Sequence, residues 1–227
     1  MTVLLCEKGR RAAKLYRDAD RAPDAYDAGW LFQADLRGVS CLEDVFAVVD
    51  KVRAYPCEML IRGNPAKWVR LEDEWVYRRS VPRPNEPASF ESADRHWTMF
   101  DADKTGIRFD KRDLKGSVER WRESLPEDLR EAEMFVQFSA SQHRSDTVRV
   151  HSYIWTKQKL NDVRLRMWAR HNGFDGSLYD AVHPHFTADP IFEGCRDPLD
   201  RKLIWLDGDS PRLRLPERAE TEIAFAR

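Results

Sequence analysis

Residues 97–103, Trp97-Thr-Met-Phe-Asp-Ala-Asp103, join a short apolar run to two closely spaced carboxylates. A short aromatic run bounded by polar residues favours a buried β-strand. Side chains two residues apart in a strand point to the same face, so both carboxylates are predicted to project together, about 7 Å apart along the chain. Such carboxylates repel unless a proton or a cation lies between them, and oxygen donors suit Mg²⁺ or Mn²⁺. The stretch predicts a divalent-metal site; the alternative is a solvated strand end with two acids.

A second strand is predicted over residues 148–155, where apolar and polar side chains alternate. Arg149, His151 and Tyr153 share one face of this strand. A guanidinium beside an imidazole makes a candidate pocket for an anion such as a triphosphate. The alternative is a surface arginine and a buried, hydrogen-bonded histidine.

Two further segments carry polar side chains at predicted strand or helix ends. Ser139 and Ser141 end a strand predicted over 134–139, where they could bind phosphate or cap the turn. Asp175 follows a helix that ends before Gly173, and is a candidate third carboxylate for the acidic pair. Asp180 competes with it for that role.

The order of predicted elements indicates an α+β fold. The strand at 97–103 is followed by helices near 118–125 and from Pro126, by two strands, and by a helix over 160–168. This order, with more strand after it, fits an RRM/ferredoxin-like sheet with helices on one face. Residues 1–60 are predicted to be mainly helical. We expect one integrated domain, with a helical and α/β part over 1–95 and a catalytic part over 96–227.

Composition excludes several classes of protein. The 227 residues include 38 Lys and Arg against 39 Asp and Glu, a net charge of −1, which excludes a wholly basic nucleic-acid coat but permits a local basic groove. Aromatic residues make up 11%, which argues against disorder. The four cysteines form no CxxC pair, so we expect free thiols and a cytoplasmic protein. No apolar run is long enough to span a membrane. A basic run forms either a solvated helix face or the wall of a nucleic-acid groove: Lys157, Lys159, Arg164, Arg166 and Arg170.

The order of these motifs resembles the archaeo-eukaryotic primase superfamily, especially the primase-polymerase domains of phages, plasmids and mobile elements. The resemblance covers about residues 55–205. It rests on the hydrophobic-Asp-x-Asp strand, the Ser-x-Ser strand end, the histidine-bearing strand, and a hydrophobic-Asp element followed by Phe186-Thr-Ala-Asp-Pro-Ile-Phe192.

The resemblance implies a metal-binding catalytic site. Asp101 and Asp103 match the family's first motif, and Phe174-Asp175 best matches its third, so these acids are expected to hold Mg²⁺ or Mn²⁺. His151 matches the second-motif histidine that contacts the incoming nucleotide. That motif is usually Ser-x-His, whereas Arg149 stands at the serine position here.

Because of this departure, phosphate binding is expected to rely on Arg149. Ser139 and Ser141 would assist from the preceding strand, and Lys104 from beside the acids. The implied activity is two-metal synthesis of primers on a single-stranded DNA template from nucleoside triphosphates, with a replicative helicase on another chain or in a missing region, and no membrane.

Two alternatives remain open. The chain could be a catalytically inactive primase-like module that binds single-stranded DNA. Asp101-Ala-Asp-Lys-Thr105 also fits the DxDxT nucleophile motif of haloacid-dehalogenase-like phosphatases, which require a parallel, Rossmann-like sheet.

Overall fold

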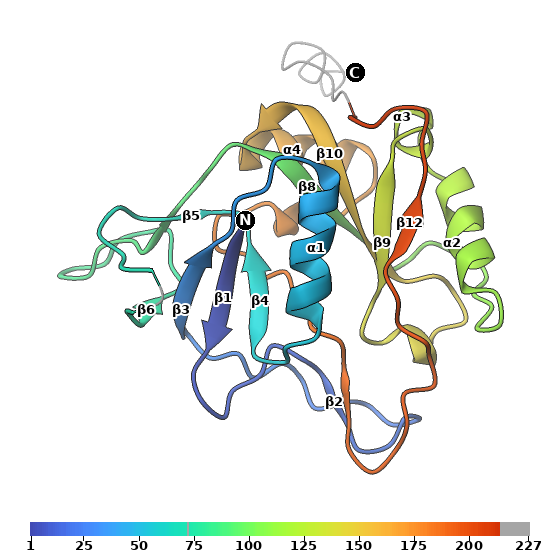
Figure 1. The fold of residues 1–227 in the computed structure, drawn as a ribbon, viewed down its shortest axis with the longest axis horizontal. Coiled ribbons are helices and arrows are strands. Elements are labelled where there is room, and N and C mark those ends of the chain that lie inside the picture. The colour runs from blue at the N-terminus through green and yellow to red at the C-terminus, as the bar shows by residue number, and fades with distance from the viewer. Residues whose placement is uncertain (72, 214–227) are drawn as a thin grey trace. The chain divides into compact units, whose positions relative to one another are not determined.

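The computed structural model describes residues 1–71 and 73–213, which contain helices and short strands (Figure 1). They form two compact units, residues 1–93 with 177–197, and residues 94–176 with 198–213. Within the described residues, no helix combines the length and the apolar character needed to cross a membrane. Residues 214–227, which the sequence-based division counts in its catalytic part, lie outside the described residues. The strands and helices are β1 (Thr2–Cys6), β2 (Leu15–Tyr16), β3 (Leu31–Leu36), α1 (Leu42–Arg53), β4 (Glu58–Ile61), β5 (Asn64–Pro65), β6 (Val76–Tyr77), β7 (Phe90–Glu91), β8 (Arg95–Ala102), α2 (Leu114–Glu123), α3 (Glu127–Arg130), β9 (Met134–Phe138), β10 (Val150–Leu160), α4 (Asp162–His171), β11 (Ile191–Phe192) and β12 (Ile204–Leu206).

The first unit is built on an antiparallel sheet of order β4-β1-β3-β6, with α1 packed against β4 (Figure 1). Side chains from its three longer strands form an apolar core that includes Leu4, Phe32 and Met59, each 0% exposed. Residues 177–197 belong to this unit, and the Gly63 amide donates to the Ala181 carbonyl oxygen at 2.9 Å.

The prediction of helices over residues 1–60 was wrong outside α1. Thr2–Cys6 and Leu31–Leu36 are strands. The first is buried along nearly its whole length between two neighbours, so it reads as a continuous apolar run, which periodicity cannot distinguish from a buried helix. Helix α1 is the part of 1–60 for which the prediction was right, because its buried side chains, such as Leu42, Val45 and Val49, recur at helical intervals.

The second unit is an antiparallel sheet of order β12-β9-β10-β8 with helices in its connections (Figure 1). The unit is therefore α+β, as predicted. Strands β8 and β9 are connected through α2 and α3, and β10 lies between them, which is a split βαβ arrangement. The fourth strand, β12, pairs with β9, whereas a ferredoxin-like sheet places it beside the first strand.

Helices α2 and α4 both contribute aromatic side chains to the face of the sheet that carries Phe100. The Phe100 ring is fully buried and lies 6.2 Å from the Trp121 ring of α2, 6.3 Å from the Trp168 ring of α4 and 4.8 Å from the Phe174 ring. Alternation along β8 therefore directs Asp101 to the opposite face.

The sheet also bears on the phosphatase alternative. Strand β8, which carries Asp101, is the edge strand of a sheet in which every neighbouring pair is antiparallel. A DxDxT phosphatase needs its nucleophile strand in a parallel sheet, so this arrangement disfavours that chemistry.

Candidate functional site

The candidate site lies where the end of β8 meets the start of β10. In this antiparallel pair His151 is directly opposite Asp101, and Val150 is opposite Ala102. His151 Nε2 is 3.8 Å from Asp101 Oδ1. Residues directly opposite each other have neighbouring side chains, so the strand register alone brings the imidazole to the carboxylate.

The same register places Arg149 against Asp103, one residue beyond each strand end. Arg149 Nε donates to Asp103 Oδ1 at 2.9 Å, and Nη2 lies 2.9 Å from Oδ2. This is the two-pronged geometry in which a guanidinium binds a carboxylate. The sequence predicted Arg149 as a phosphate ligand, and here it neutralises one of the two acids.

Asp101 is the electrostatically unusual member of the site. Its Oδ1 atom is buried and has no hydrogen-bond partner. Burial raises the pKa of Asp101; His151 and Arg149 oppose that rise, while the negative charges of Asp103 and Asp175 add to it. A buried carboxylate oxygen without a donor favours binding a proton or a cation.

Two Phe-Asp pairs relate Asp175 to Asp101. The Phe100 and Phe174 rings are in contact, with centroids 4.8 Å apart, and each is followed by an aspartate. The charge of Asp175 acts on Asp101. Asp180, the competing candidate, belongs to the first unit, where its carboxylate accepts a hydrogen bond from the Val182 amide at 3.0 Å. The choice of Asp175 over Asp180 as the third acid therefore stays a prediction, which the effect of the Asp175 charge on Asp101 supports.

A pocket of about 280 Å³ opens beside the two acids. Asp101, Asp103 and Lys104 line one part of it, and the ends of α2 and α4 contribute residues such as Trp121 and Asn172. The volume is close to the lower limit for small-molecule sites. Lys104 therefore lines the pocket beside the acids, and its role in phosphate binding stays a prediction.

The two serines lie at the end of β9 and hold its turn together. The Ser139 amide donates to the Arg149 carbonyl oxygen at 2.9 Å, and the two serine hydroxyls are 3.2 Å apart. The Ser141 amide lies 3.4 Å from the Ser139 hydroxyl, and both side chains are buried. These contacts match the capping alternative, and neither serine lines the pocket beside the acids.

Sequence reasoning assigned no role here to Tyr153. Its side chain is fully buried and stacks on Phe135, with centroids 4.7 Å apart, and its hydroxyl has no hydrogen-bond partner. Burial raises the pKa of Tyr153, and the charge of Asp101 raises it further. The alternation in 148–155 already placed Tyr153 on the face of His151, but only the register shows that this face also carries Asp101.

The residues present fit a divalent cation in part. Asp101 offers a buried oxygen without a donor, and carboxylates are the ligands that Mg²⁺ and Mn²⁺ prefer. Both oxygens of Asp103 are engaged by Arg149. In residues 1–71 and 73–213, no three or more His, Cys, Asp or Glu side chains gather into a metal-binding group. A cation bound by both acids would therefore either share the Asp103 carboxylate with Arg149 or displace Arg149 from it.

No protein-family model, no curated protein and no solved structure matches this chain. The family resemblance therefore rests on the order and spacing of the motifs in the chain.

Proposed function

We propose that this chain is a nucleotidyltransferase of the primase-polymerase type, which synthesises primers on single-stranded DNA with Mg²⁺ or Mn²⁺ for a phage, plasmid or other mobile element. The observation that carries the proposal is the cross-strand group at the ends of β8 and β10. There two carboxylates face an imidazole and a guanidinium, and a pocket opens beside the acids. The split βαβ arrangement of β8, β9 and β10 around that group supports the proposed RRM-like catalytic sheet, from which the position of β12 departs.

In this proposal some side chains of the site bind the divalent cations and others bind the nucleotide. Asp101, Asp103 and Asp175 would bind the divalent ions, which when bound lower the pKa of the attacking 3′-hydroxyl and neutralise the leaving pyrophosphate. Arg149 would exchange the Asp103 carboxylate for the triphosphate of the incoming nucleotide. Because a guanidinium binds phosphate with the same two-pronged geometry, this exchange needs no change in its hydrogen bonding.

His151 and Lys104 would complete the nucleotide site. His151 lies on the face that carries Asp101, and Lys104 lines the pocket. Holding a triphosphate in line with the attacking group supplies much of the acceleration in phosphoryl transfer, because the developing charge is met by groups already in place.

The direct test is nucleotide incorporation by wild type and Asp103→Asn. The protein is incubated with a single-stranded DNA oligonucleotide, labelled ribo- or deoxyribonucleoside triphosphates and Mg²⁺ or Mn²⁺. We expect elongated products from the wild type and a loss on the order of 10³-fold in the variant, since a charged ligand contributes at least as much as one preorganised hydrogen-bond donor. Asp200→Asn, at an exposed carboxylate that pairs with the exposed Lys202, is the matched control. Equal activity of wild type and Asp103→Asn would reject the proposed site.

A second candidate function follows from the Arg149–Asp103 ion pair. Since both oxygens of Asp103 are already engaged, the chain could bind a nucleotide or single-stranded DNA without catalysing transfer. Nucleotide binding that needs a divalent metal, without any product, would favour this binding module over the enzyme.

Arg149→Gln tests the exchange directly. Removing the guanidinium frees the Asp103 oxygens, so Mn²⁺ should bind the nucleotide-free protein about fivefold more tightly, the equivalent of about 1 kcal/mol for a partly exposed ion pair. Incorporation should nevertheless fall, because the triphosphate loses its ligand. Titration calorimetry with Mn²⁺ measures the first effect. Unchanged or weaker Mn²⁺ binding would show that Asp103 is not a ligand.

A further inference from the structure

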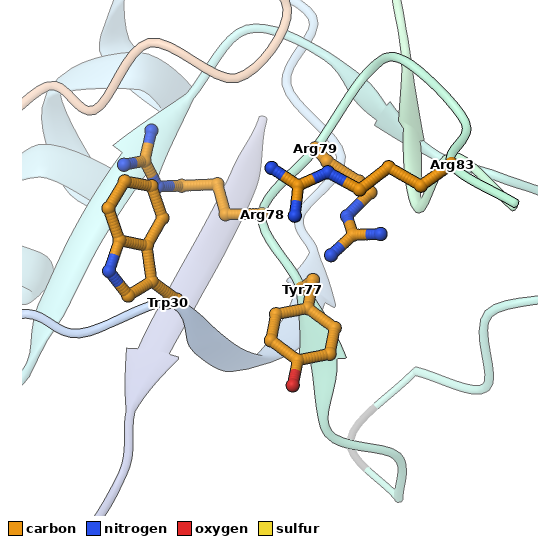
Figure 2. Close-up of a pocket in the computed structure, with 5 residues that line it drawn as sticks. All are labelled: Trp30, Tyr77, Arg78, Arg79 and Arg83. Carbon is orange, nitrogen blue, oxygen red and sulfur yellow. The ribbon is translucent and has the colours of Figure 1, made fainter. Parts of the chain in front are cut away.

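A second pocket, of about 320 Å³, lies in the first unit and is lined entirely by aromatic and cationic side chains (Figure 2). Its lining residues are Trp30, Tyr77, Arg78, Arg79 and Arg83. None of them belongs to the acidic site, and none is among the candidate site residues named from the sequence.

The backbone holds the two aromatic residues on neighbouring strands. Trp30 immediately precedes β3, and Tyr77 ends β6, the edge strand of the sheet, where it pairs with Leu31. The Arg78 amide donates to the Trp30 carbonyl oxygen at 3.1 Å. The rings are therefore positioned by sheet hydrogen bonds rather than by a free loop.

The loop after Tyr77 is also held by backbone hydrogen bonds. The Phe90 amide donates to the Arg79 carbonyl oxygen at 3.0 Å, and the backbones of Arg83 and Glu86 exchange hydrogen bonds of 2.8 and 3.0 Å. The arginines around the pocket are thus carried by a loop with defined backbone contacts.

Both aromatic rings are unusually accessible. Trp30 is 69% exposed and Tyr77 is 44% exposed. The Arg78 guanidinium lies 5.8 Å from the Trp30 ring centroid, and that of Arg79 lies 4.6 Å from the Tyr77 ring (Figure 2). Exposed aromatic rings beside cations form a surface suited to flat, electron-rich, anionic ligands.

The positive charge of the pocket is only partly compensated. Arg79 forms an ion pair with Glu86, and Arg78 donates to the Val182 carbonyl oxygen. Burial lowers the pKa of Arg78. The negative charge of Asp180 raises this pKa, but by less than burial lowers it. Arg83 makes no side-chain ion pair or hydrogen bond with the residues the structure describes, so its guanidinium is available to an anion.

We propose that this pocket binds single-stranded nucleic acid, with bases stacked on Trp30 and Tyr77 and the phosphate backbone held by Arg79 and Arg83. Base stacking on aromatic side chains beside a cationic groove is the general basis of single-strand binding. A strand, rather than a free nucleotide, fits best because the rings are exposed at a sheet edge instead of being enclosed by walls. This binding does not depend on nucleotidyl transfer at the acidic site.

The test measures the affinity for a labelled oligothymidylate of about 12 nucleotides by fluorescence anisotropy. A metal chelator is present so that no metal-dependent binding contributes. Trp30→Ala should weaken binding roughly tenfold or more. Arg83→Ala should reduce the slope of log affinity against log salt by about 0.7, as expected for one lost phosphate contact to a single strand. The matched controls are Tyr55→Ala and Arg21→Ala, at exposed positions of the same unit that do not line the pocket. Both should bind like the wild type.

Three results would overturn the proposal. They are absence of binding by the wild type, equal affinities of the pocket variants and the wild type, and equally tight binding of a free nucleoside triphosphate with the same sensitivity to Trp30→Ala. Melting temperatures of all variants verify folding, and Trp30→Phe, which keeps a ring, should restore most of the affinity. If the incorporation assay fails while this binding persists, only the proposed enzymatic function is rejected.

Discussion

We expect Asp101→Asn to abolish nucleotide incorporation while making the metal-free protein more stable than the wild type. Activity should fall on the order of 10³-fold, because the substitution removes the charge of the most buried acid of the site. The melting temperature should rise by about 2–4 °C, equivalent to about 1 kcal/mol in a chain of this length.

The gain in stability follows from the surroundings of the Asp101 carboxylate. Its Oδ1 is buried without a hydrogen-bond donor, and Asp103 and Asp175 add negative charge nearby. Ionised Asp101 therefore destabilises the metal-free folded state. Asparagine has nearly the same shape and removes the charge. Such a trade of stability for function is common at active sites.

Metal addition provides the control for this prediction. Mn²⁺ should raise the melting temperature of the wild type, since a ligand that binds only the native state stabilises it. It should have little effect on Asp101→Asn. Two results would contradict the assignment of Asp101 to the metal site. One is a variant less stable than the wild type in the presence of a metal chelator, and the other is a variant that Mn²⁺ stabilises as much as it stabilises the wild type.

Phe100→Ala should produce the largest loss of stability, about 3–5 kcal/mol in the free energy of unfolding. The ring is fully buried, and it contacts aromatic rings from α2, from α4 and from the segment before Asp175. Its removal leaves a cavity between the sheet and both helices. Denaturant unfolding measures the loss, and Val163→Ala, at a 62% exposed position of α4, should change stability by less than about 0.5 kcal/mol.

The same substitution also tests how the acids are brought together. Because Phe100 and Phe174 pack against each other and each precedes an aspartate, their contact relates Asp101 to Asp175. Phe100→Leu, which keeps an apolar side chain, should retain most of the stability yet reduce incorporation. A loss below about 1 kcal/mol in Phe100→Ala would show that the ring is not central to the packing of this unit.

The local pattern of the chain was sufficient for the elements around the candidate site. A short apolar run predicted the strand near 97–103 and alternation predicted the strand near 148–155, and the structure has them as β8 and β10. The spacing of apolar residues likewise predicted α4. In residues 1–60 the same reasoning was wrong, since a strand buried on both faces has no alternation to detect.

The amino-acid sequence by itself determined which residues could carry chemistry: two acids one residue apart, a histidine and an arginine on one strand face, and a Phe-Asp pair after a helix. Only the tertiary structure decided how they meet. Strand register set Asp101 opposite His151 and turned Arg149 toward Asp103, and the pairing of β3 with β6 brought Trp30 and Tyr77 to one pocket. Register depends on pairing between segments far apart in the chain, and that pairing is chosen by packing of the whole sheet rather than by any local pattern.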